Sequence, residues 1–194
     1  MFRKIIMHPS KKLRAKTKQV ENTADVQALI KDLIDTCNVE MGAGLAGPQI
    51  GVSTSVVVIK PKVFGKENPD PSAYNKDFMV LINPEIVTQG EMIEWKEACL
   101  SIPGVSGTVS RSETALIKYT SETGEDKKFI AEWPFSGGLQ HECDHLQGLL
   151  FIHRMDGRKA ARLLETKRKL VRKAKIQAKK QKRFEQERGK GTQK

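Results

Sequence analysis

Apolar residues recur every three or four positions between Asp25 and Glu40, which predicts a first helix. Thr23 precedes this stretch and suits the N-cap position, where its side-chain oxygen can accept a hydrogen bond from the backbone. The apolar stripe consists of Val26, Leu29, Ile30, Leu33, Ile34 and Cys37. Because Cys37 continues this stripe, we expect it to be a core residue rather than a metal ligand.

Short apolar runs rich in β-branched residues predict strands in the middle of the chain. They lie at residues 56–59, 78–87, 92–95, 114–120 and 127–133. Asn83-Pro84 interrupts the second run, because proline has no backbone N–H to give to a sheet. Glu122-Thr-Gly predicts a hairpin between the last two runs. Residues 41–51 and 61–76 are rich in turn-forming residues and predict loops.

Two further helices are expected in the last third of the chain. Gly137-Gly138 opens one that continues to about Leu149, and a long, strongly charged helix follows from about Arg158. This order of elements favours the α+β class, with small mixed or antiparallel sheets around a central helix and a C-terminal helix. We expect residues 1–157 to form the main domain and residues 158–194 a basic helical tail.

Charge is distributed unevenly between these two parts. The 194 residues carry 34 Lys and Arg against 23 Asp and Glu, a net charge of +11. Residues 158–194 hold 16 basic and three acidic side chains, so the tail carries +13 and the rest of the chain −2. Such a polycation favours docking on RNA phosphates over a merely solvated helix. Its one aromatic residue, Phe184, argues against stacking on bases.

The chain has no sequence feature of a membrane or secreted protein. No uncharged apolar run approaches the roughly 20 residues of a membrane span, and the first residues lack the apolar centre of a signal peptide. Three cysteines are an odd number, which excludes a complete disulfide framework. We therefore expect a reducing, intracellular environment with free thiols.

The segment His141-Glu142-Cys143-Asp144-His145 carries the strongest chemical signal. Residues i and i+4 share one face of a helix, so both imidazoles can point at one metal ion. Glu142 lies beside that face, where its carboxylate can reach a water on the metal without binding the ion. Cys143 faces away from a metal held there. The pattern therefore predicts a metal hydrolase with a general base.

A catalytic metal usually has three protein ligands and one open position, so a third ligand is required. Cys99 lies between strand signals and is a candidate, because a thiol beside a divalent ion loses its proton. Spacing alone leaves open whether Cys99 binds metal or is a small buried thiol. His8 and His153 have no partner at ligand spacing and are expected to be surface or packing residues.

Three segments together resemble the motifs of a known family. Gly-Ala-Gly-Leu-Ala-Gly-Pro-Gln at 42–49 is a loop whose backbone can approach a ligand closely, with Gln49 as an amide donor. This loop, Glu-Ala-Cys-Leu-Ser at 97–101 and Gln-His-Glu-Cys-Asp-His at 140–145 resemble, in order, the three motifs of peptide deformylases. The likeness covers roughly residues 5–155 and leaves the basic tail outside the motifs.

The resemblance implies a metal-dependent hydrolase that acts on nascent polypeptides. It would remove the N-formyl group from their formyl-methionine by attack of metal-bound water and release formate. Cys99, His141 and His145 would hold the metal, and Glu142 would be the general acid and base. The resemblance thus implies that the third ligand is the thiolate.

The resemblance also implies roles for residues around the metal. Gln49 and the backbone N–H of Leu100 would stabilise the oxyanion, and Glu97 would pair with Arg111 behind the metal site. The exposed backbone of Gly44 would pair with the extended peptide. The implied substrate-binding residues are Ala43, Gly44, Leu45, Gly137 and Gly138.

The chain departs from the family pattern at several positions, none of which is a metal ligand or the general base. Gly47 stands where the family usually has alanine, Ala98 where it usually has glycine, and Ala43 where a larger aliphatic residue is common. Gly137-Gly138 stands where bulkier residues are frequent, at the border of the methionine pocket. The size and side-chain preference of this pocket therefore do not follow from the resemblance.

The resemblance further implies a metal and a partner. Fe(II) is the favoured ion, and Zn(II), Ni(II) and Co(II) also suit one sulfur and two imidazole ligands. The partner would be the ribosome and its RNA, reached through the basic tail, with no membrane involved. The compartment would be the cytoplasm of a bacterium or of a phage-infected host, or an organelle.

Two other functions are compatible with parts of the sequence. A different metallopeptidase using the same helix motif would cleave other blocked or internal peptide bonds and ignore the formyl group. An RNA-binding protein with a structural metal would have a closed coordination sphere and no hydrolase activity. Glu142 favours an enzyme, because a general base has no purpose in a structural site.

Overall fold

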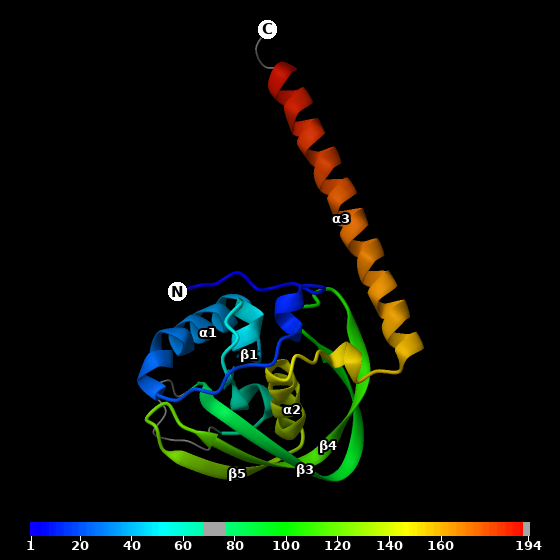
Figure 1. Cartoon of the computed structure of the whole chain (residues 1–194). Helices are drawn as coiled ribbons and strands as arrows, with labels where there is room; N and C mark the ends of the chain where they lie inside the picture. Colours follow the sequence, from blue (N-terminus) through cyan, green and yellow to red (C-terminus); the bar gives the residue numbers. More distant parts are fainter. Residues whose placement is uncertain (68–76, 192–194) are drawn as a thin grey trace.

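A computed structural model describes residues 1–67 and 77–191 of the chain, coloured along the sequence in Figure 1. The α-helices are α1 (Gln27–Val39), α2 (Phe135–Leu146) and α3 (Gly157–Gly191). Five short 3₁₀ turns are η1 (Lys11–Arg14), η2 (Thr23–Val26), η3 (Gly47–Ile50), η4 (Pro61–Phe64) and η5 (Phe151–His153). The strands are β1 (Gly44–Ala46), β2 (Val56–Ile59), β3 (Met79–Ala98), β4 (Ser106–Thr120) and β5 (Asp126–Glu132).

The three predicted helices are present, with different ends. The first begins two residues later than predicted, after the turn η2, and the expected N-cap Thr23 is wrong. Val26 precedes α1 and makes no side-chain capping bond. Asn22 caps the turn η2 instead, where its side chain accepts a hydrogen bond from the backbone N–H of Ala24 at 3.0 Å. The central helix includes Phe135 and ends at Leu146, three residues before the predicted end. Of the predicted tail, residues 192–194 lie outside the described part.

The strands form one antiparallel sheet in the order β1-β2-β3-β4-β5, which confirms the α+β class. The predicted strands 78–87 and 92–95 are one long strand, β3, which continues through two register shifts, one at Asn83-Pro84 and one between Gln89 and Met92. Asn83 has a φ of 52°, and the register against β4 shifts between Ile82 and Glu85. The predicted hairpin between β4 and β5 is confirmed.

Two features of the loops differ from the prediction. The region 41–51, predicted to be a loop, contains the edge strand β1, which pairs with β2. At three residues this strand is too short to show an alternating pattern. The predicted loop 61–76 begins with the turn η4, and its residues 68–76 lie outside the described part.

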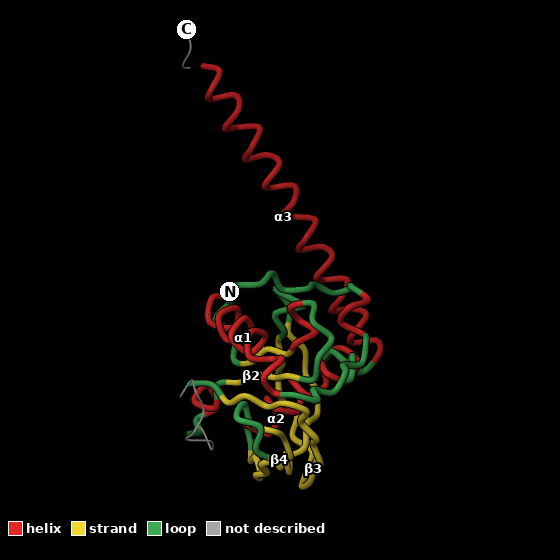
Figure 2. Tube along the Cα trace, turned by 60° about the vertical axis from the view of Figure 1, so that its left-hand side comes forward, coloured by secondary structure: helices red, strands yellow, loops and turns green. Residues whose placement is uncertain are grey.

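The sheet curves around α2, which is the centre of the molecule (Figures 1 and 2). All 12 residues of α2 are buried. Leu139 and Leu146 of α2 pack with Val57, Leu81 and Ile117 of the sheet in one hydrophobic cluster. A second cluster joins α1 to β2, and a third joins the end of β3 to η5 and the start of α3. The polar residues of α2 are therefore held inside a rigid surround.

The helix α3 projects away from this body in both views (Figures 1 and 2). Leu163 and Leu164 at its start pack against the third cluster. All side chains described from Arg168 to Lys182 are exposed. Within the described ranges, none of the helices combines the length and apolar character needed to cross a membrane.

Candidate metal centre

The two histidines of the central helix face each other across one turn of α2. The ring centroids of His141 and His145 lie 5.0 Å apart, and the rings are nearly perpendicular. Both side chains are buried. The spacing of four residues therefore places the two imidazoles on one face, as the sequence pattern predicts.

Cys99 brings a sulfur to this pair from the turn that follows β3. Its Sγ lies 3.4 Å from Nε2 of His145, and the ligand atoms of Cys99, His141 and His145 all lie within 4.8 Å of one another. Burial alone would raise the pKa of the Cys99 thiol, but the adjacent His145 and His141 hold that pKa well below its usual value. A thiolate and two imidazoles are donors that suit Fe(II), Zn(II), Co(II) or Ni(II), so these residues fit one such ion.

A buried carboxylate orients the first histidine from behind. Oε2 of Glu97 lies 2.6 Å from Nδ1 of His141, which leaves Nε2 of the ring for the metal site. Arg111 holds Glu97 in place by two hydrogen bonds, 2.8 Å from Nε and 3.1 Å from the second guanidinium nitrogen. Trp95 donates its indole N–H to the same carboxylate at 2.8 Å. These contacts fix the ring orientation of His141.

The ionic network continues beyond Glu97 to the start of the tail. Arg111 also donates to Asp144 at 2.6 Å, and Asp144 pairs with Arg154, three residues before α3. Burial alone would raise the pKa of Glu97, but hydrogen bonds from His141 and Arg111 lower it to about 2. The carboxylate therefore stays charged at neutral pH, as a partner of a metal-binding histidine should.

Glu142 lies against the backbone of the glycine-rich segment. A Cβ atom on Gly44 would come within 2.8 Å of Oε1 of Glu142, so only glycine allows this close approach. Oε2 of Glu142 is buried and has no hydrogen-bond partner among the described residues. Burial raises the pKa of this carboxyl group above its ordinary value. The side chain thus offers one oxygen for a proton at the site.

Gln49 has its side chain fixed by its own turn. Its Oε1 accepts a hydrogen bond from the backbone N–H of Ala46 at 2.8 Å, so its amide nitrogen faces Sγ of Cys99, at 3.7 Å. The amide is therefore a preorganised donor beside the metal position.

The N-terminal segment holds two loops of the site in place. The backbone N–H of Ile6 donates to the carbonyl of Gln49, and that of His8 donates to the carbonyl of Ser101.

A cavity of about 160 Å³ opens at this centre. Of the predicted substrate-binding residues, Ala43, Gly44 and Gly138 line it, as does Leu100. Two others lie off the cavity. Leu45 is fully buried in the cluster beneath α1, since side chains alternate along a strand, and Gly137 faces Trp133 and Trp95 instead.

Two lining residues were not predicted from the sequence. Phe64 comes from η4 and Trp95 from β3, and both side chains border the cavity. Long-range packing brings Phe64 there, whereas Trp95 lies two residues before Glu97 on β3 and therefore faces the same side of the strand. Two sequence signals could have indicated these residues: an aromatic side chain in a predicted loop for Phe64, and the spacing of two residues from Glu97 for Trp95.

The other cysteines and histidines lie away from the metal position. Cys37 is fully buried and donates to the carbonyl of Gly42, and Cys143 is buried on the opposite side of α2. Burial raises the pKa of each of these thiols to about 12. His153 accepts the backbone N–H of Leu150 at 2.9 Å, so it packs locally, while His8 lies beside α3.

Comparison with known proteins places this geometry in one family. The family model described as polypeptide deformylase matches residues 2–161. A peptide deformylase of Aquifex aeolicus is 37% identical over 172 residues, covering 88% of this chain and 98% of the relative. The solved peptide deformylases of Legionella pneumophila and Thermus thermophilus are 36% and 31% identical, with TM-scores of 0.74 and 0.76. They cover 88% and 89% of this chain, and 98% and 97% of their own chains. Sequence, fold and the resemblance of the three motifs thus agree, and the chain belongs to the polypeptide deformylase family.

Proposed function

We propose that Cys99, His141 and His145 hold one divalent metal ion, and that the chain uses this centre to remove the N-formyl group from nascent polypeptides. Metal-dependent removal of the N-formyl group is the activity of the family to which the chain belongs. The observation that carries the assignment of roles is the buried Oε2 of Glu142, which no described residue pairs, next to three converging ligand atoms. A structural site would have no use for that oxygen.

The reaction is the hydrolysis of an amide. A divalent ion at these ligands supplies Lewis-acid polarisation and lowers the pKa of water. Oε2 of Glu142 takes a proton from the water that adds to the formyl carbon, and then gives it to the amine nitrogen as the C–N bond breaks. Formate and a free amino terminus leave. Burial raises the pKa of Glu142, which favours its holding of the proton between the two steps.

Two donors face the oxygen on which negative charge develops. The amide nitrogen of Gln49 is held toward the centre by the bond from Ala46 to its Oε1. The backbone N–H of Leu100 is the second donor, from the residue next to Cys99. Fixed donors stabilise the transition state more than the neutral substrate, which accelerates the reaction.

The peptide part of the substrate is proposed to extend the sheet. β1 is an edge strand of the five-stranded sheet, so the backbone of Gly44 can pair with an extended chain. The small cavity receives the formyl group and the side chain that follows it. Since a formyl carbon carries only hydrogen, a site of this size excludes an acetyl methyl group by steric clash.

Formate release from formyl-Met-Ala-Ser, compared with hydrolysis of acetyl-Met-Ala-Ser, tests this function. We expect the metal-loaded protein to release formate and to leave the acetyl peptide intact. Equal cleavage of both peptides, or cleavage of an internal bond, would instead indicate a general metallopeptidase. A protein that holds one metal per chain and hydrolyses neither peptide would be a structural metal protein.

Fe(II) is the proposed working ion. The thiolate and two imidazoles accept several divalent ions, and the family resemblance favours iron among them. Metal analysis of anaerobically purified protein is the check, with about one iron per chain expected. Exposure to air should reduce activity, because ferrous iron and the Cys99 thiolate both oxidise.

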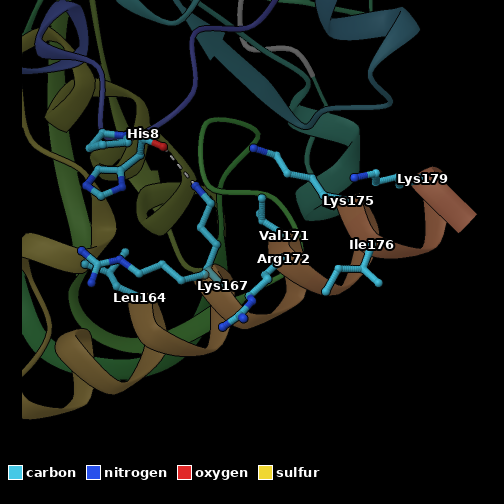
Figure 3. A pocket seen from close by; sticks show the side chains of 10 residues that line it. His8, Leu164, Lys167, Val171, Arg172, Lys175, Ile176 and Lys179 are labelled. Carbon is cyan, nitrogen blue, oxygen red and sulfur yellow. Dashed lines mark hydrogen bonds between the residues drawn. The ribbon is translucent and has the colours of Figure 1, made fainter.

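The tail is proposed to dock on ribosomal RNA as a part distinct from the catalytic domain of residues 1–157. A groove of about 720 Å³ runs between α3 and the N-terminal segment (Figure 3). Lys167 donates to the carbonyl of His8 at 3.3 Å, which joins the two walls. The basic side chains Arg172, Lys175 and Lys179 line the groove further along the helix. Docking there would place the protein where translation takes place, in the cytoplasm or an organelle.

Replacing Arg172, Lys175 and Lys179 with glutamine tests the tail. Each phosphate contact contributes to salt dependence, so the slope of log affinity for ribosomes against log salt should fall by about 2 to 3. The control replaces Lys31, Lys118 and Lys128, three exposed lysines of the body, with glutamine. An equal loss of ribosome affinity in both variants would show that binding depends on net charge and not on the tail. Unchanged ribosome binding by the tail variant would refute the proposal.

A further inference from the structure

Two glycines at the start of α2 are covered by aromatic rings from other elements. A Cβ atom on Gly138 would lie 2.7 Å from Cε1 of the Phe64 ring and closer still to its Cζ atom. A Cβ atom on Gly137 would lie 2.9 Å from Trp133 and 3.1 Å from Trp95. Non-bonded carbon atoms in proteins do not approach to less than 3.0 Å, so a side chain at either position would clash with a ring. The rings therefore occupy the space that larger side chains of α2 would fill.

The Phe64 ring is held firmly in this position. Phe64 closes the turn η4 and packs on Phe135 of α2, with the ring centroids 5.8 Å apart. Gly65 ends the turn in the left-handed conformation, with a φ of 70°. Lys66 then pairs with Glu132 of β5 at 3.1 Å. The segment that carries Phe64 is therefore tied to both α2 and the sheet.

Trp95 lines the same cavity and is also held in place. Its indole N–H donates to Glu97, the carboxylate that orients His141, and its ring meets Trp133 edge to face with centroids 4.9 Å apart. Phe64 and Trp95 both line the cavity that contains Cys99 and Glu142. The apolar part of the cavity thus has walls built from residues outside the metal helix.

We propose that Phe64, with Trp95, determines which side chain is accepted next to the formyl group. This inference rests on the proposed function. At about 160 Å³ the cavity is smaller than the roughly 300–1,000 Å³ of most ligand pockets, so it suits one narrow, unbranched side chain. A thioether between aromatic rings gains favourable sulfur–aromatic contacts, which favours methionine. Gly137 and Gly138 provide the room that these rings need.

Phe64→Ala tests the role of the ring. Removal of the ring should enlarge the cavity, so the ratio of kcat/KM for formyl-Met-Ala-Ser to that for formyl-Phe-Ala-Ser should fall about tenfold or more. Phe129→Ala is the matched control, because Phe129 also packs on Phe135, with centroids 6.2 Å apart, but does not line the cavity. That control should keep the wild-type ratio. Phe64→Leu, which retains apolar volume, should give a smaller change in the same direction.

Gly138→Ala gives a reciprocal test. In the wild-type background its methyl group must displace the Phe64 ring, so kcat/KM for formyl-Met-Ala-Ser should fall. In the Phe64→Ala background the same substitution meets no ring and should have little effect, a coupling that a general loss of stability would not produce.

Two outcomes would overturn the inference, and they differ. If Phe64→Ala and Phe64→Leu turn over formyl-Met-Ala-Ser and keep the wild-type ratio, Phe64 does not set the preference, and the proposed function stands. If the metal-loaded wild-type protein releases no formate from either peptide, the proposed function fails and this inference fails with it.

Discussion

Replacing Glu142 with glutamine is expected to lower kcat about 10³-fold while about one metal ion per chain remains bound. Glutamine has nearly the same shape, but it cannot accept a proton at the atom that corresponds to Oε2. The ligands Cys99, His141 and His145 are untouched, so metal content should not change. Formate release under single-turnover conditions, together with metal analysis, measures both quantities.

Glu94→Gln is the matched control for this substitution. Glu94 is an exposed residue of β3, so the same chemical change there should leave kcat unaltered. KM of the Glu142 variant should also change little, because the lost interaction acts on the transition state. Near-normal turnover by metal-loaded Glu142→Gln protein would remove Glu142 from the mechanism.

Replacing Arg111 with methionine is expected to lower the free energy of unfolding by about 3–5 kcal/mol at pH 7. Arg111 is buried between two carboxylates, Glu97 and Asp144, and pairs with both. Removing it takes away the positive charge that compensates the two buried carboxylates. Methionine has a similar length and cannot donate a hydrogen bond. Urea unfolding of wild-type and variant protein in EDTA measures the difference without a contribution from metal release.

The stability lost in Arg111→Met should depend on pH. Hydrogen bonds from His141 and Arg111 hold the pKa of Glu97 in the folded protein at about 2, below its ordinary value of 4.5, so these contacts add stability that is fully present above pH 4.5. That stability is lost as the pH falls from 4.5 toward 2. The difference between wild type and variant should therefore shrink over this range.

Lys118→Met provides the control for this series. Lys118 is an exposed residue of the same strand, so its replacement should change the free energy of unfolding by less than about 1 kcal/mol. A difference between wild type and Arg111→Met that stays constant from pH 7 to pH 3 would show that Glu97 is not held charged by this network.

The metal helix could be predicted from the sequence because its signal is local. The spacing of His141 and His145 by itself puts both rings on one face, whichever fold surrounds them. The third metal ligand could not be assigned from spacing, since Cys99 reaches the site only through the turn after β3. The family resemblance supplied that assignment, and the structure places its Sγ 3.4 Å from His145.

The remaining differences come from contacts that are distant in sequence. β1 has three residues and owes its conformation to pairing with β2, so no local pattern indicates it. β3 continues through Asn83-Pro84 because a bulge accommodates the missing N–H of proline. Phe64 and Trp95 enter the cavity only because Gly138 and Gly137 leave space, a relation between residues more than 40 positions apart.

X-ray absorption at the zinc edge of Zn(II)-loaded protein tests the metal centre most directly. The account predicts one sulfur at about 2.3 Å, two imidazole nitrogens at about 2.0–2.1 Å and one further light atom from solvent. The sulfur signal should vanish in Cys99→Ser. A spectrum without sulfur in the wild type, or with four protein ligands and no solvent position, would contradict the account.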